Sequence, residues 1–208
     1  MLAIVDYKAG NLTSVALALH EIGQQCAVTD DKDTILAAER IIFPGVGSAG
    51  TAMRQLKALG LDSVMREAFN RGTPIMGLCL GTQIILGYSE EQDAACLDLI
   101  AGRTVRFPAD MQEPDGRRLK IPHMGWNKIA VRKAHPVLAG VDPLDEFYFV
   151  HSYYPRPADP GMVLATCEYG VEFPAAVGVK NLFAVQFHPE KSSRVGLKLL
   201  ANFCEWRP

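Results

Sequence analysis

A cysteine between two glycines is the residue of this chain best suited to do chemistry. The segment Gly77–Gly81 reads G-L-C-L-G and lies between an apolar run and a stretch with helical character. A nucleophile elbow has this pattern, because glycines let a tight strand-to-helix turn close without Cβ clashes. The free N–H groups that begin a helix favour a thiolate and can also stabilise an oxyanion. Cys79 is therefore predicted to attack a carbonyl carbon, whereas the other four cysteines lack this context.

A thiolate nucleophile generally works with a histidine that a carboxylate orients. His188 directly follows the apolar run Phe183–Phe187, and Glu190 stands close behind it. Open α/β sheets place their sites at the carboxyl ends of strands, where Cys79 is also expected. The predicted triad is Cys79, His188 and Glu190. His151 also ends an apolar run but has no acidic residue after it, and is assigned to packing or to the substrate pocket.

A glycine-rich turn, Pro44–Gly47, follows another apolar run, Arg40–Phe43. It is expected at the same edge of the sheet as Cys79. There its unobstructed N–H groups could supply the second donor of an oxyanion hole. The alternative is a strand-to-helix turn with no catalytic part.

The elements that must position these residues alternate in the first half of the chain, as in βαβ units with a parallel, buried sheet. Strands are predicted over Leu2–Val5, Cys26–Thr29, Arg40–Phe43 and Pro74–Leu78, and helices over Leu12–Ile22, Thr34–Ala38, Thr51–Leu59, Leu61–Phe69 and Leu80–Gly87. The second half has few helices, which suggests an antiparallel extension. Its predicted strands are Val105–Phe107, Trp126–Val131, Phe147–His151, Val163–Cys167, Ala175–Val179 and Phe183–Phe187, before a last helix at Ser193–Trp206. One α/β domain over residues 1–208 is expected, with a mostly parallel central sheet flanked by helices.

The composition excludes several classes of function. Lys plus Arg number 21 and Asp plus Glu 23, so the charge of −2 offers no surface for nucleic acid. No stretch reaches the roughly 18 apolar residues of a membrane span. The five cysteines form neither a CxxC pair nor a zinc pattern. We therefore expect free thiols, a cytoplasmic location, and neither metal nor cofactor.

The two catalytic segments resemble the triad-type (class I) glutamine amidotransferases. The family pattern G-x-C-x-G-x-Q is met from Gly77 to Gln83, and its H-P-E motif is met from His188 to Glu190. The resemblance implies the family's fold and its reaction. Cys79 would attack the side-chain amide of glutamine, with His188 as general base and then as acid toward the departing ammonia. Water would then release glutamate from a γ-glutamyl thioester.

The same resemblance implies roles for further residues. Glutamine would be held by Gln83, Glu91, Gly45 and the backbone of Ser152 and Tyr153. The oxyanion N–H groups would come from Gly47 and Leu80. The residues that face a partner subunit would be Trp126, Asn127 and Lys180.

Other segments are similar to one branch of the family, in which the ammonia passes to a separate (βα)₈-barrel cyclase subunit of histidine biosynthesis. They are Asp6–Leu12, Pro44–Gly47, Pro122–Asn127, His151–Tyr153 and Gln186–Ser192. This implies a heterodimer. As a further hypothesis, the glycine-flanked turn Gly45–Gly47 would need to reorient to complete the oxyanion hole, so that the glutaminase would stay slow until the partner carries its ligand. Two residues depart from the family pattern: Lys8, where glycine is common, and Thr82, where methionine is common.

Three other functions remain open at this point. The chain could be the glutaminase subunit of another pathway, although the segment Gly125–Asn127, G-W-N, argues against this. It could be a stand-alone cysteine hydrolase, which would work without a partner. It could also be a non-catalytic module on the same fold, although all three triad residues are present.

Overall fold

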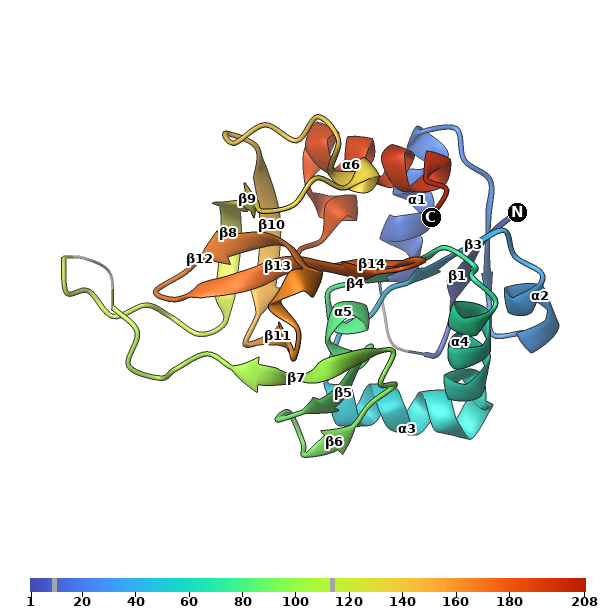
Figure 1. The fold of residues 1–208 in the computed structure, drawn as a ribbon, viewed down its shortest axis with the longest axis horizontal. Coiled ribbons are helices and arrows are strands. Elements are labelled where there is room, and N and C mark those ends of the chain that lie inside the picture. Colours follow the sequence, from blue (N-terminus) through green and yellow to red (C-terminus); the bar gives the residue numbers. More distant parts are fainter. Residues whose placement is uncertain (9–10, 113–114) are drawn as a thin grey trace.

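An eight-stranded sheet forms the centre of the molecule (Figure 1). The computed structural model describes residues 1–8, 11–112 and 115–208; Ala9 and Gly10, in the segment Asp6–Leu12, lie outside the described residues. In spatial order the strands are β2 (Cys26–Thr29), β1 (Leu2–Val5), β3 (Arg40–Phe43), β4 (Ile75–Leu78), β14 (Leu182–Val185), β13 (Glu172–Val179), β12 (Val163–Glu168) and β9 (Ala130–Val131). The first five are parallel neighbours, and β13, β12 and β9 continue the sheet antiparallel. The predicted fold class is confirmed.

Both faces of the inner parallel strands β1, β3, β4 and β14 are buried. Leu2 and Ile4 of β1 face one core, while Ala3 and Val5 face the other. Helices α1 (Leu12–Glu21) and α6 (Ser193–Glu205) cover the first face, and α3 (Ala49–Leu59) and α4 (Leu61–Asn70) cover the second, on opposite sides of the sheet in Figure 1. Because every side chain of such a strand meets apolar neighbours, these strands are continuous apolar runs in the sequence.

Two smaller sheets complete the second half. One has the order β11-β7-β5-β6 and the other pairs β10 with β8. Their strands are β5 (Leu86–Ser89), β6 (Ala94–Ala95), β7 (Ile100–Arg106), β8 (His123–Lys128), β10 (Glu146–His151) and β11 (Tyr153–Pro157). The remaining helices are α2 (Lys32–Leu36), α5 (Leu80–Ile84) and short 3₁₀ turns at Pro136–Leu138, Pro160–Met162 and Pro189–Lys191.

The predicted helix Leu80–Gly87 is wrong in its second half. Helix α5 ends at Ile84, and strand β5 begins at Leu86, where it pairs in parallel with Ile100 of β7. The run Ile84–Leu86 is fully buried, so its apolar residues fit a helix or a strand equally well. Pairing with β7, which begins at Ile100 and not at the predicted Val105, decides for the strand.

None of the helices within residues 1–8, 11–112 and 115–208 has the length and apolar character needed to cross a membrane. Across those same ranges, no group of three or more His, Cys, Asp or Glu side chains could hold a metal ion.

The carboxyl ends of four parallel strands gather the chemistry-bearing residues at one edge of the sheet. Tyr7 follows β1, Gly45 follows β3, Cys79 follows β4 and His188 follows β14. Segments far apart in the sequence are thus neighbours, as the position of α/β active sites requires.

Candidate active site

The turn between β4 and α5 is a nucleophile elbow. Cys79 has φ 50° and ψ −105°, a backbone conformation that is uncommon outside glycine, and its N–H donates to Val185 O at 2.9 Å. The flanking glycines are required by close approach. A Cβ on Gly81 would lie 2.0 Å from Phe43 O, and one on Gly77 would lie 2.9 Å from the Ala184 Cβ. The sharp turn thus holds Cys79 at the beginning of α5.

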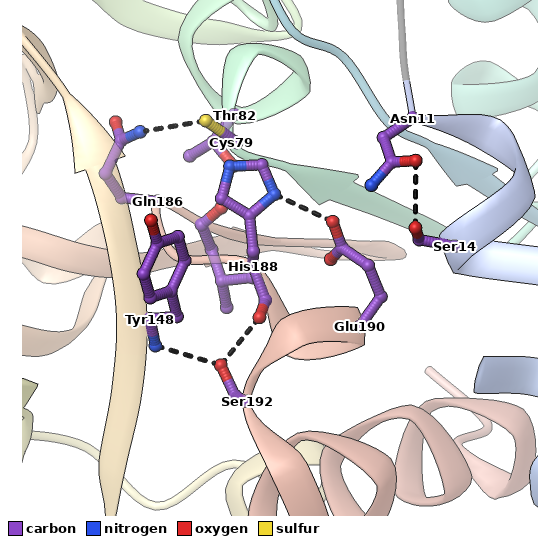
Figure 2. Close-up of polar contacts among 10 residues, drawn as sticks. Asn11, Ser14, Cys79, Thr82, Tyr148, Gln186, His188, Glu190 and Ser192 are labelled. Atoms are coloured by element: carbon purple, nitrogen blue, oxygen red, sulfur yellow. Dashed lines mark hydrogen bonds and ion pairs between the residues drawn. The ribbon is translucent and has the colours of Figure 1, made fainter. Parts of the chain in front are cut away.

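His188 and Glu190 form a buried pair beside the cysteine. Nδ1 of His188 lies 2.8 Å from Oε1 of Glu190, and the two side chains are 3% and 2% exposed. Figure 2 shows the imidazole between the Cys79 sulfur and the Glu190 carboxylate. Since Nδ1 is used by Glu190, Nε2 is the nitrogen left for chemistry, and it has no hydrogen-bond partner among the described residues.

The charges around His188 favour its protonated form. Burial alone would lower its pKa, but a thiolate at Cys79 together with the Glu190 carboxylate raises the pKa of His188 to about 10. With a thiolate present, the imidazole therefore carries a proton at neutral pH. The pair can begin the reaction as thiolate and imidazolium.

Ser192 fixes the segment that carries the histidine, a role that the sequence reasoning missed. Its Oγ donates to His188 O at 2.6 Å and accepts from the N–H of Tyr148 on β10 at 3.0 Å. The His188 N–H in turn donates to Tyr148 O at 2.9 Å. The only signal for Ser192 was its place in the segment Gln186–Ser192.

A cavity of about 310 Å³ opens in front of the cysteine, a volume that suits a small ligand. It brings together most of the residues predicted for the site. Its lining comprises Val46, Gly47, Cys79, Leu80, Gln83, Glu91, Pro122, Val150, His151, Ser152, Tyr153 and His188. Gly45 and Glu190 stand behind this lining, each bonded to a residue within it.

The Glu91 side chain is fixed by a backbone hydrogen bond. Its Oε2 accepts the N–H of Ala49, at the start of α3, at 2.7 Å. Burial raises the pKa of this carboxyl, although the Ala49 hydrogen bond opposes the shift. A carboxylate thus stands at the cavity wall, held by the positive end of a helix.

The two predicted oxyanion donors differ in their state. The Leu80 N–H donates to Gly45 O at 3.3 Å, so this donor is occupied within the protein. Gly47 lies in the same turn with φ 100°, a conformation that favours glycine. The turn would have to move for the Leu80 N–H to face the cavity.

Both side-chain N–H groups of Gln83 donate hydrogen bonds within the protein. Its Nε2 donates to Tyr153 O at 2.8 Å and to Gln186 Oε1 at 3.1 Å. Gln186 Nε2 donates in turn to the Cys79 sulfur at 3.7 Å (Figure 2). Gln186 belongs to the segment Gln186–Ser192, but the sequence alone predicts no role for it.

His123 and His151 form a second buried histidine pair. Nδ1 of His123 lies 3.1 Å from Nε2 of His151, whose Nδ1 donates to Tyr153 O at 2.7 Å. Burial lowers the pKa of His123 to about 4 and that of His151 to about 3. His151 lines the cavity, and its bonds to His123 and Tyr153 hold it in the cavity wall.

The predicted partner-facing residues do not lie together. Trp126 is 51% exposed on β8, and its ring lies 6.0 Å from that of Tyr148; Asn127 follows it and donates to Glu168 O at 2.9 Å. Lys180, however, lies in the turn that precedes β14, at the edge of the sheet opposite to Cys79.

A different lysine, Lys191, lies over the Tyr148 ring that Trp126 also contacts. Nζ of Lys191 stands 5.8 Å from the centre of the Tyr148 ring, whereas Lys180 lies over Phe69. Placing Lys180 on the same face as Trp126 is therefore corrected by the topology.

Comparisons with known proteins agree with this geometry. The model of the family "Glutamine amidotransferase class-I" matches residues 3–206. The chain is 52% identical over 203 residues to the imidazole glycerol phosphate synthase subunit HisH of Nitratidesulfovibrio vulgaris strain DP4, covering 98% of this chain and 95% of that protein. It is 47% identical over 209 residues to the same subunit of Aromatoleum aromaticum, covering 99% and 98%.

A solved structure shares the fold at low identity. A chain of PurLQS from Thermotoga maritima superposes with a TM-score of 0.71 at 20% identity, over 98% of this chain and 97% of that one. The chain belongs to the class I glutamine amidotransferases and, within them, to the family of HisH subunits of imidazole glycerol phosphate synthase.

Proposed function

We propose that this chain hydrolyses glutamine to glutamate and ammonia, as the glutaminase subunit of an imidazole glycerol phosphate synthase. The observation that carries the proposal is the placement of Cys79 and His188 at one cavity, with Glu190 bonded to His188 behind it, on a chain of this family. Formation and hydrolysis of the thioester require neither a metal nor a cofactor.

The first half of the reaction forms the thioester. The Cys79 thiolate attacks the side-chain amide carbon of glutamine, and the carbonyl oxygen becomes an oxyanion. The C–N bond then breaks while Nε2 of His188 gives its proton to the nitrogen, so that ammonia leaves. Because the pKa of His188 is raised, the imidazolium is ready to act as this acid from the start.

The second half regenerates the enzyme. His188, now neutral, takes a proton from water as the water attacks the γ-glutamyl thioester. The C–S bond breaks, glutamate leaves, and the thiolate and imidazolium are restored. Glu190 does not change its protonation; its hydrogen bond to Nδ1 holds the ring and stabilises the imidazolium.

The charges and polar atoms of the cavity favour one orientation of glutamine. Glu91 supplies a negative charge for the ammonium group of glutamine, and the backbone of Ser152 and Tyr153 offers polar atoms to its other end. Gln83, whose N–H groups are engaged, offers its Oε1 as an acceptor. Gly45 would contribute to substrate binding through the Pro44–Gly47 turn, in which it lies.

The ammonia goes to another polypeptide. We propose a heterodimer with a (βα)₈-barrel cyclase subunit, which makes imidazole glycerol phosphate and an aminoimidazole carboxamide ribotide in histidine biosynthesis. Trp126 and Asn127 would face it, and Lys191 replaces Lys180 as the cation on that side. We place the complex in the cytoplasm, in keeping with five free cysteines.

Partner binding would also control the rate. Since the Leu80 N–H is bonded to Gly45 O, the oxyanion hole is incomplete in this conformation. We propose that the liganded cyclase shifts the Gly45–Gly47 turn and so completes the hole, with donors at Gly47 and Leu80.

The test is glutamate release by the purified chain, alone and with a barrel cyclase partner that carries its ribotide ligand. A Cys79→Ala variant should be inactive in both settings. Cys204→Ala, which alters a buried thiol of α6 far along the chain, is the matched control and should keep activity. Strong activation by the liganded partner supports the proposal. Full activity without a partner would point instead to a stand-alone hydrolase, and none in any setting to a non-catalytic module.

A further inference from the structure

Gln186 lies at the end of β14 with its side chain against the reacting sulfur. It is fully buried, and its own N–H donates to Ala175 O at 2.9 Å, which fixes the backbone there. In extended chain, alternate residues point to the same side. Gln186 and His188 therefore both face Cys79, while Phe187 between them points into the core beside Phe147.

The orientation of the Gln186 amide is set by a main-chain carbonyl. Tyr153 O can only accept hydrogen bonds, and it takes one from Gln83 Nε2 and one from His151 Nδ1. The second N–H of Gln83 then points at Gln186, which must present Oε1 to it. The NH₂ group of Gln186 is thereby left facing the Cys79 sulfur at 3.7 Å.

We propose that Gln186 is a catalytic residue of this site, whose amide N–H stabilises the Cys79 thiolate before attack and as it departs from the thioester. This deepens the proposed function and rests on it. A neutral donor suits the task, because it favours the thiolate without competing for the proton that His188 must deliver. Tyr153 and His151 act as positioning groups that keep the donor turned toward sulfur.

Other titratable groups around Cys79 do not supply this donor. His188 provides charge and the proton, and Glu190 acts on it from behind. Burial, and then a charge on Cys79, raise the pKa of the Tyr7 hydroxyl after β1, but this hydroxyl makes no hydrogen bond to the sulfur or to any other described residue. His151 and Glu91 line the same cavity but use their bonded atoms on Tyr153 O and on the Ala49 N–H.

The test reads the thiolate directly. Iodoacetamide alkylation of Cys79 is followed by mass spectrometry as a function of pH, in the full chain. Gln186→Met keeps the approximate shape but has no donor, and its alkylation profile should move to higher pH by about one to two units, a ten- to hundredfold loss of thiolate. In the complex, kcat should fall by a similar factor while KM changes little.

Two further variants keep the test decisive. Gln186→Glu still accepts from Gln83 but faces the sulfur with a negative charge, so its profile should shift further; it also serves if Gln186→Met does not fold. Thr82→Val removes a buried hydroxyl that donates to Val185 O beside Cys79, without touching the sulfur, and should leave the profile in place. A folded Gln186 variant whose profile overlays that of the unaltered chain would overturn the assignment, even if its kcat were reduced. Alkylation needs no glutamine, so this result stands apart from failure of the glutaminase assay.

Discussion

The N–H of Leu80 donates to the carbonyl oxygen of Gly45 across 3.3 Å, and so joins the elbow to the glycine turn. The bond is long, and a backbone hydrogen bond of ordinary geometry contributes only about 1 kcal/mol net. A partner that contacts the turn could therefore break it at modest cost. In the proposed activation, this bond is the contact that partner binding would break.

Gly45→Ala should prevent the proposed movement of the Gly45–Gly47 turn. An added Cβ would lie 2.0 Å from the Tyr7 hydroxyl and 3.0 Å from the Leu80 Cβ, both in the buried interior. Overpacking of this kind costs about 1–3 kcal/mol and forces the turn or Tyr7 to shift. We expect partner-activated glutamate release to fall at least tenfold.

The control for Gly45→Ala is Gly23→Ala. Gly23 has φ 75° after α1 and nothing within 4 Å of an added Cβ, so it carries backbone strain without a clash. That variant should lower the free energy of unfolding in urea by about 1 kcal/mol and keep full activity. Equal activity in the two variants would show that the space beside Gly45 does not matter.

Glu190→Gln should change the pH profile of glutamate release. His188 must be protonated to release ammonia, and the Cys79 thiolate together with the Glu190 carboxylate raises its pKa to about 10 before attack. Removing the carboxylate removes one of the groups that raise this pKa, so the alkaline limb of kcat should move to lower pH. The rate at neutral pH should fall on the order of 10²–10⁴-fold. Glu205→Gln, on α6, should change neither. An unshifted alkaline limb would argue against Glu190 acting through His188.

The catalytic elbow could be predicted because its signals are local. A thiol between glycines at the end of an apolar run has few structural alternatives, and the close approach of Gly81 to Phe43 O shows why no larger residue fits there. His188 and Glu190 are two residues apart, so one turn determines their geometry. The parallel sheet could also be predicted from the sequence, since β1, β3 and β4 are continuous apolar runs.

Contacts between distant segments could not be predicted in this way. The role of Gln186 depends on the Tyr153 carbonyl, which reaches it only through Gln83. Lys180 and Lys191 flank the same catalytic segment in sequence, but β14 separates them, so they lie near opposite edges of the sheet. Only the topology distinguishes the two lysines.

Lys8 departs from the family pattern, and Lys8→Gly should show that the ion pairs of Lys8 offset the strain of its backbone. Lys8 has φ 64°, which glycine adopts without steric cost, and its Nζ lies 3.2 Å from Asp6 Oδ2 and 3.0 Å from Asp30 Oδ2. Salt screens exposed ion pairs but not backbone strain. The variant should therefore gain in melting temperature relative to the unaltered chain as salt is raised from about 0.05 M to about 1 M.

Asp30→Asn separates the two effects of Lys8, because it removes one ion pair and leaves the backbone unchanged. It should reproduce part of the salt dependence and none of the relief of strain. Parallel salt curves for all three proteins would show that the ion pairs of Lys8 contribute nothing to stability.

The buried pair His123 and His151 should make the protein sensitive to acid. Their pKa values are lowered by burial to about 4 and about 3, whereas in the unfolded chain both lie near 6.5. Below pH 6.5 the unfolded state therefore binds protons that the folded state does not, and the free energy of unfolding falls by about 1.4 kcal/mol per pH unit for each histidine. The loss should continue until pH approaches 4, where His123 begins to protonate in place.

In urea titrations between pH 7.5 and 4.5, His123→Gln should reduce the pH slope by about one proton. His20→Gln, which alters an exposed histidine of α1, is the control. If His123→Gln kept the full slope, the acid sensitivity would have to come from other groups, such as the carboxylates or His135, whose pKa burial also lowers to about 4, and the pair would be no more than packing beside the cavity.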